Sequence, residues 1–150
     1  MATLKPEASL WKKLKGKLPP HWNTTRIENR VGAGVPDVHI CAEGVPFWLE
    51  LKTTKTSRVN ISSSQVAWNF AYAKSGGVSF FLISPLLSPN LYLFDGVHGR
   101  ELLDHGLRTG QSGSGSVTAV PCLWSGSDWS GLVVGMLEVA RGRVGGRGPS

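Results

Sequence analysis

The chain has 150 residues, of which 41% are hydrophobic and 17% charged, proportions typical of a globular domain rather than a disordered segment. No apolar run reaches the roughly 18 residues that a membrane span needs, and no segment resembles a signal peptide, so we expect a cytoplasmic protein without a membrane partner. Its two cysteines are too few for a disulfide scaffold. Sixteen lysines and arginines against ten acidic residues leave a net charge of +6, which favours a polyanionic partner.

Apolar periodicity and turn residues divide the chain into helices and strands. The first helix is expected at Pro6–Lys15, because leucines recur there at helical spacing and Gly16 follows. The later elements are expected, in order, as strands at Trp22–Asn29, Asp37–Ala42 and Val45–Lys52, a helix from the capping box Ser62–Gln65 to Ser75, strands at Val78–Ser84 and Leu91–Phe94, and a short helix at Gly99–His105. This order predicts an α/β (α+β) fold around a mixed sheet.

The composition changes toward the C-terminus, where eleven of the nineteen glycines lie between Glu101 and Ser150. We expect a folded core at 1–108 and a Gly/Ser-rich loop at 109–116. An apolar segment at 117–140 is expected to pack on the core or at a dimer interface, and 141–150 to form a disordered basic tail.

The two strands around Glu43-Gly44 place charged residues opposite one another. If Glu43 and Gly44 form the turn of a hairpin, Ala42 faces Val45 and Asp37 faces Glu50. Lys52 then shares the sheet face of Glu50, while the leucines beside Glu50 point into the core. Two facing carboxylates repel unless a cation lies between them, so the pattern indicates a site for Mg²⁺, with Mn²⁺ as its substitute. Such an ion supports phosphodiester hydrolysis, and Lys52 could offset developing negative charge.

These residues also form a recognisable string. Gly34-Val-Pro-Asp37, then Glu50-Leu-Lys52 and Gln65, resembles the G-x-P-D … E-x-K … Q pattern of the PD-(D/E)XK nuclease superfamily, and is especially similar to VRR-NUC-type and phage Holliday junction-resolving endonucleases. The resemblance spans residues 7–83. It implies a restriction endonuclease-like core with a helix, a three-strand antiparallel meander, a second helix and further strands.

The resemblance also implies roles for individual residues. Asp37, Glu50 and the backbone carbonyl of Leu51 would hold the metal, with Lys52 as the catalytic lysine and Gln65 close to the scissile phosphate. Family members often add a glutamate from the first helix. Glu7 fits that position because it shares a helix face with Leu10 and Leu14, and Glu28 on the first strand is the rival.

Basic residues around this string are candidates for DNA contacts, and we name Lys12, Lys13, Lys55 and Arg58. We expect a Mg²⁺-dependent endonuclease without a small-molecule cofactor that acts on branched DNA, most simply a Holliday junction. Two paired incisions would require a homodimer. The alternatives are a nuclease acting on flaps, nicks or sequence-defined duplex, and a non-catalytic nucleic-acid-binding module.

Overall fold

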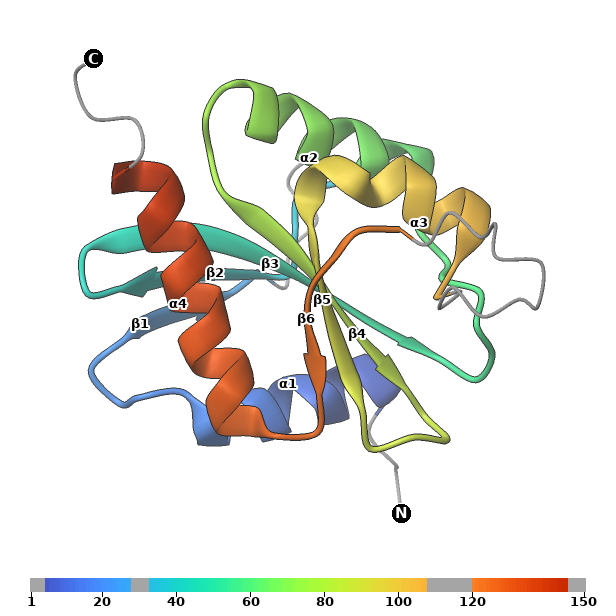
Figure 1. Cartoon of the computed structure of the whole chain (residues 1–150), viewed down its shortest axis with the longest axis horizontal. Coiled ribbons are helices and arrows are strands. Elements are labelled where there is room, and N and C mark those ends of the chain that lie inside the picture. The colour runs from blue at the N-terminus through green and yellow to red at the C-terminus, as the bar shows by residue number, and fades with distance from the viewer. Residues whose placement is uncertain (1–4, 28–32, 108–119, 146–150) are drawn as a thin grey trace.

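The computed structural model describes residues 5–27, 33–107 and 120–145, which form a six-stranded sheet with helices on both faces (Figure 1). The elements in chain order are α1 (Pro6–Lys17), β1 (Asn23–Arg26), β2 (Val38–Ala42), β3 (Val45–Thr54), α2 (Ser63–Lys74), β4 (Ser79–Pro85), β5 (Leu91–Asp95), the 3₁₀ turn η1 (Gly96–His98), α3 (Gly99–His105), β6 (Cys122–Gly126) and α4 (Trp129–Gly145). The expected α/β class with a mixed sheet is confirmed.

The strands lie in the sheet in the order in which they occur in the chain. β1, β2 and β3 form one antiparallel meander, and β4, β5 and β6 form a second. The parallel pair of β3 and β4 joins the two meanders, and α2 provides the crossover between them. The β3 carboxyl end and the β4 carboxyl end therefore lie at the same edge of the sheet.

The hairpin between β2 and β3 has the predicted turn and register. Glu43 has φ 52° and Gly44 has φ 82°, the two left-handed residues that a two-residue type I′ turn requires. Ala42 pairs with Val45 and Val38 with Leu49, so the register deduced from the sequence is confirmed. β3 continues to Thr54, two residues past the predicted end.

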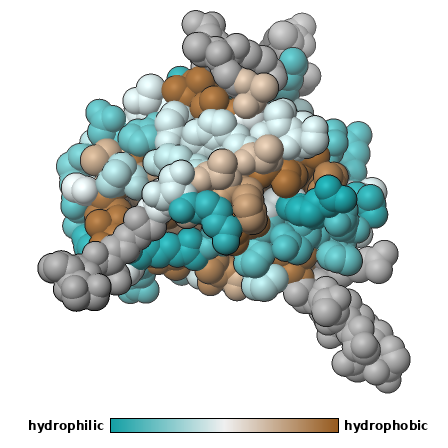
Figure 2. All heavy atoms as spheres, turned by 90° about the horizontal axis from the view of Figure 1, so that it is seen from above, coloured by the Kyte–Doolittle hydropathy of each residue, from teal (hydrophilic) through white to brown (hydrophobic). Residues whose placement is uncertain are grey.

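Each face of the sheet carries its own apolar cluster. α1 and α4 cover one face, where Leu14, Leu49 and Leu132 are completely buried. On the other face, Phe81 and Ile83 pack with Leu102 beneath α2 and α3. Figure 2 looks onto this second side, where hydrophilic and apolar residues are interleaved over the surface.

The first helix runs further than predicted. α1 continues through Gly16 to Lys17, and its chain becomes extended at Leu18. Gly16 lies on the exposed side with nothing near it, so the helix tolerates it, whereas the two prolines that follow cannot continue the helix.

The C-terminal part of the chain also differs from prediction. Its apolar residues form an edge strand, β6, and a helix, α4, which continues to Gly145, five residues into the range expected to be a tail. Two contacts explain the helix: Trp124 lies against Gly131 and Gly135, and Arg143 forms an ion pair with the buried Asp95. Residues 109–116 and 146–150 lie outside the described part of the chain. The helices of the described part are all too short or too polar to span a membrane.

Candidate active site

The centre of the site is Glu50, in the middle of β3. Leu49 and Leu51 point to the α1 and α4 side and are buried in the core, so Glu50 points to the side of α2. Its side chain is only 3% exposed. Lys52 lies two residues further along the strand, with its Nζ 3.9 Å from Glu50 Oε2. The alternation of β3 therefore places a carboxylate and an ammonium on one face.

Asp37 lies one residue before β2, beside Glu50. Its Oδ2 accepts a hydrogen bond of 2.9 Å from the backbone amide of Leu51, and its own carbonyl accepts one of 2.7 Å from Ile27. The first bond ties the Asp37 side chain to the strand that carries Glu50 and Lys52. The structure thus brings the predicted Asp37 and Glu50 together, as the hairpin register required.

Gly34 fixes the loop that leads into Asp37. It has φ +86°, and a Cβ at this position would overlap the carbonyl of Ser64 in the first turn of α2. Only glycine allows this combination of backbone conformation and close approach. The glycine of the G-x-P-D string therefore lets the Asp37 loop dock against the N-terminal end of α2.

Gln65 occupies that first turn of α2 and reaches Glu50. Its backbone amide donates to Ser62 Oγ, and its Oε1 accepts from the Ser62 amide, which together make the predicted capping box. Its Nε2 donates to Glu50 Oε2 at 3.1 Å. Because the cap holds Oε1, the amide orientation that directs Nε2 toward Glu50 is fixed.

The surroundings of Glu50 disfavour the ionised form of its carboxyl group. Burial, and then the negative charge of Asp37, raise the pKa of Glu50 from 4.5 to about 9, because together they outweigh the attraction of Lys52. One oxygen of this carboxyl, Oε1, is buried and has no hydrogen-bond partner in the described part of the chain. A buried carboxyl with an unpaired oxygen beside a second carboxylate is the donor set that a hard divalent cation fits.

These side chains border a cavity of about 930 Å³. Its charged lining residues are Lys5, Glu7, Arg26, Asp37, Glu50 and Lys52. The described part of the chain contains no group of three or more His, Cys, Asp or Glu side chains suited to a metal. A cation here would therefore be held by the two carboxylates together with backbone or water oxygens, and Leu51 borders the same cavity.

Of the two candidates for a third carboxylate, the structure describes only Glu7. Glu7 lines the cavity from α1, and its Oε2 accepts hydrogen bonds from the amide and hydroxyl of Thr53, three residues after Glu50. Glu28, the alternative, lies outside the described residues. Glu7 is thus anchored to the strand that carries the site.

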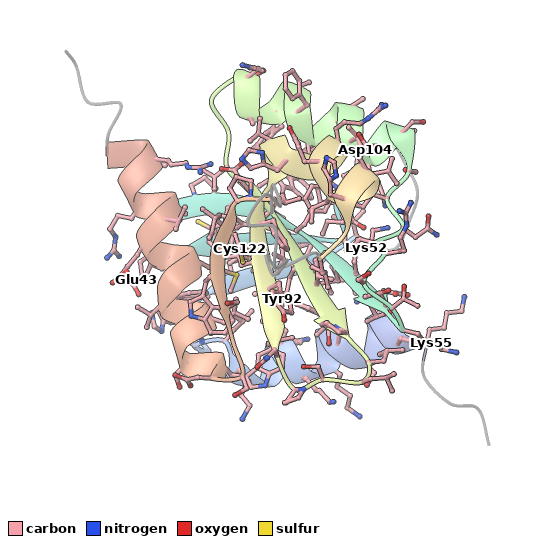
Figure 3. All side chains as sticks on the ribbon, turned by 45° about the vertical axis from the view of Figure 1, so that its right-hand side comes forward. Glu43, Lys52, Lys55, Tyr92, Asp104 and Cys122 are labelled. Atoms are coloured by element: carbon pink, nitrogen blue, oxygen red, sulfur yellow. The ribbon has the colours of Figure 1, made fainter. Side chains whose placement is uncertain are left out.

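The predicted DNA-contact residues lie outside the cavity. Lys12 and Lys13 are exposed on α1, and Lys55 and Arg58 are exposed in the loop after β3. Figure 3 shows Lys52 close to the sheet and Lys55 at the outer rim, near the start of α1.

Two cavity cations, Arg26 and Lys5, were not singled out from the sequence. Arg26 ends β1, and its Nη1 is buried without a hydrogen-bond partner among the described residues. The sequence predicts a longer strand, Trp22–Asn29, so Arg26 lay inside it with no signal of a site, whereas the observed strand ends at Arg26.

Comparisons with known proteins found a partial structural similarity and no sequence match. No protein-family model matches this sequence, and no curated protein matches it. Among solved structures, the chain is similar to Hjc of Archaeoglobus fulgidus, described as a Holliday junction resolvase from an archaeal hyperthermophile. The identity is 16%, the TM-score is 0.45, and the alignment covers 60% of this chain and 74% of that chain. Any functional assignment therefore has to come from the residues of the site.

Proposed function

We propose that this chain is a Mg²⁺-dependent endonuclease that hydrolyses phosphodiester bonds in DNA, with branched DNA and above all the four-way Holliday junction as its substrate. The observation that carries the proposal is the buried Glu50 carboxyl, which borders a polar cavity, has one oxygen without a partner among the described residues, and has Asp37 and Lys52 beside it. A fold that needed only stability would gain nothing from this arrangement, since a buried, incompletely bonded carboxyl is costly.

In this proposal, Asp37, Glu50 and the Leu51 carbonyl hold the cation. When bound, Mg²⁺ would lower the pKa of water and offset negative charge on the phosphodiester. Lys52 places a positive charge beside Glu50 on the cavity side, where it can orient water or stabilise charge on the reacting phosphate. Gln65 orients Glu50 by donating to its Oε2, so that Oε1 remains for the cation.

The surroundings of the site support a polyanionic substrate. Lys5, Arg26 and Lys52 border the cavity, and the exposed Lys12, Lys13, Lys55 and Arg58 extend the positive charge over neighbouring surfaces. Such contacts would bind phosphates and position the DNA without reading its bases. Resolution of a junction requires two incisions, so we propose that the active form is a homodimer with two such sites.

The test compares cleavage of a four-way junction with cleavage of a linear duplex of the same sequence, with and without Mg²⁺ and then with Mn²⁺. Symmetric cuts in the junction alone, only with metal, would support the proposal. Equal cutting of both substrates would indicate a less selective nuclease, and binding without cutting in either metal would indicate a non-catalytic module.

Two variants connect the activity to the site. Glu50→Ala should abolish cleavage while junction affinity stays within about tenfold, because the phosphate contacts remain. Glu138→Gln, an exposed acidic position on α4, is the matched control and should cleave like the parent chain. Retained cleavage by Glu50→Ala would remove the basis of the site assignment.

A further inference from the structure

The turn between β4 and β5 exposes two adjacent leucines. Leu86 is 43% exposed and Leu87 is 87% exposed, the largest exposure among the bulky apolar residues of the described chain. Pro85 and Pro89 flank the pair. Isolated apolar residues on a surface are ordinary, but two leucines at the end of a projecting hairpin form a local apolar tip.

Hydrogen bonds hold this leucine tip in place. Within the turn, the amide of Ser88 donates to the Pro85 carbonyl at 3.4 Å, and the amide of Asn90 donates to Ser88 Oγ at 3.1 Å. The amide of Leu86 donates to the Thr54 carbonyl at the end of β3, at 2.8 Å. The tip is therefore fixed to the strand that carries Glu50.

The leucine tip lies at the same edge of the sheet as the active site. In the parallel pair, Glu50 faces Phe81 and Thr54 faces Pro85. At about 3.3 Å per residue, four residues place the base of the tip roughly 13 Å beyond Glu50 along the strands. In Figure 1 the β4–β5 turn projects at the lower right, and the loop after β3 lies on the same side of the molecule.

A basic loop lies next to the leucine tip. Lys55 and Arg58 are exposed on it, and the Thr54 hydroxyl braces it by donating to the Arg58 carbonyl and accepting from the Thr56 amide. Its Ser57 carbonyl accepts a hydrogen bond of 2.7 Å from Leu107, just after α3. An apolar tip beside two exposed cations on a braced loop complements DNA, which offers apolar base faces between charged phosphates.

We infer that Leu86 and Leu87 form a wedge that packs against an exposed base-pair face where stacking in the DNA is interrupted. This inference rests on the proposed function and gives it a source of selectivity. Aliphatic side chains that enter a continuous duplex must first unstack a base step, whereas a junction, flap or nick already presents a base-pair face. Lys55 and Arg58 would bind the phosphates beside that face, so that the wedge favours branched over linear DNA.

The experiment measures binding of the full chain to a four-way junction and to a linear duplex of the same sequence, with EDTA present to prevent cleavage. Leu87→Ser should weaken junction binding by about tenfold, the loss expected when one leucine no longer buries its side chain. Duplex binding should stay within about twofold, because phosphate contacts provide it. Since Leu87 is almost fully exposed, folding should be unaffected. Val134→Ser, with 53% exposure on α4, is the matched control and should bind both DNAs like the parent chain.

Three results would overturn the inference. If Leu87→Ser binds both DNAs like the parent, or loses the same affinity for both, the leucine tip does not select branched DNA, and the proposed nuclease can still stand. If the substitution changes the oligomeric state measured by light scattering without DNA, the tip is a contact between copies of the chain. If the parent binds neither DNA, the proposed function fails as well.

Discussion

Gly34 offers the most direct test of how the fold positions the site. Replacing it by alanine introduces two separate costs. The residue has φ +86°, a conformation that costs an L-residue about 1–2 kcal/mol. The new Cβ would also lie 2.5 Å from the carbonyl carbon of Ser64 and 3.1 Å from the amide nitrogen of Gln65, an overlap with backbone that cannot rotate away. Overpacking of this kind adds about 1–3 kcal/mol.

Gly44 separates these two contributions. It has φ +82° in the β2–β3 turn, and a Cβ there would meet nothing within 4 Å. Gly44→Ala should therefore lower the free energy of unfolding by about 1–2 kcal/mol, and Gly34→Ala by about 2–5 kcal/mol. Urea denaturation of both variants measures the difference. The overlap at Gly34→Ala would also shift the loop that carries Asp37. This variant should therefore lose DNA cleavage under conditions where it remains folded.

Equal destabilisation by the two substitutions would refute the reasoning. It would mean that backbone conformation alone accounts for Gly34, and that the loop is not held against α2. Unchanged cleavage by a folded Gly34→Ala chain would mean that the position of Asp37 does not depend on how this loop docks against α2.

The remaining predictions concern individual side chains of the site. In the metal-free protein, the raised pKa of Glu50 means that the native state binds one more proton than the unfolded state between about pH 4.5 and pH 9. The free energy of unfolding should thus fall by a few kcal/mol as pH rises through that window, and Mg²⁺ should stabilise the folded protein more at high pH than at low pH. Urea titrations measure both effects, and the Glu50→Gln variant should show neither. Gln65→Ala and Ser62→Ala should each lower the free energy of unfolding by about 0.5–2 kcal/mol, because both break the capping box. Only Gln65→Ala should reduce cleavage, since Gln65 contacts Glu50 and Ser62 does not. Equal cleavage by these two variants would contradict the positioning role of Gln65. If Arg26 binds a phosphate, Arg26→Gln should lower the slope of log DNA affinity against log salt concentration by about one. Arg100→Gln on α3 is the control and should leave the slope unchanged. A loss of stability with an unchanged slope would assign Arg26 a structural role.

The hairpin could be predicted from the sequence because its signals are local. Glu43-Gly44 specifies a two-residue turn, the turn sets the register, and the register places Asp37 opposite Glu50. The capping box at Ser62 is similarly local, and it located the start of α2. Each of these inferences needed only residues close together in the chain.

The C-terminal helix could not be predicted because its stability comes from distant partners. Gly131 and Gly135 lower intrinsic helix propensity, yet they leave room for the Trp124 indole. Arg143 pairs with Asp95, which lies on β5. The same limit applies to Arg26, because only the assembled sheet brings the end of β1 to the cavity beside Asp37.

The sequential order of the strands has a consequence for the growing polypeptide during synthesis. Each new strand can pair with the one before it, so the hairpin that bears Asp37 and Glu50 can assemble while later segments are still being made. α4 arrives last, and it covers apolar side chains of β3 that α1 alone leaves open. A nascent chain released before Trp129 would therefore lack the helix that covers one face of the sheet. The apolar side chains of that face, opposite the one that carries Glu50, would be exposed to solvent. Early termination is thus a route to aggregation.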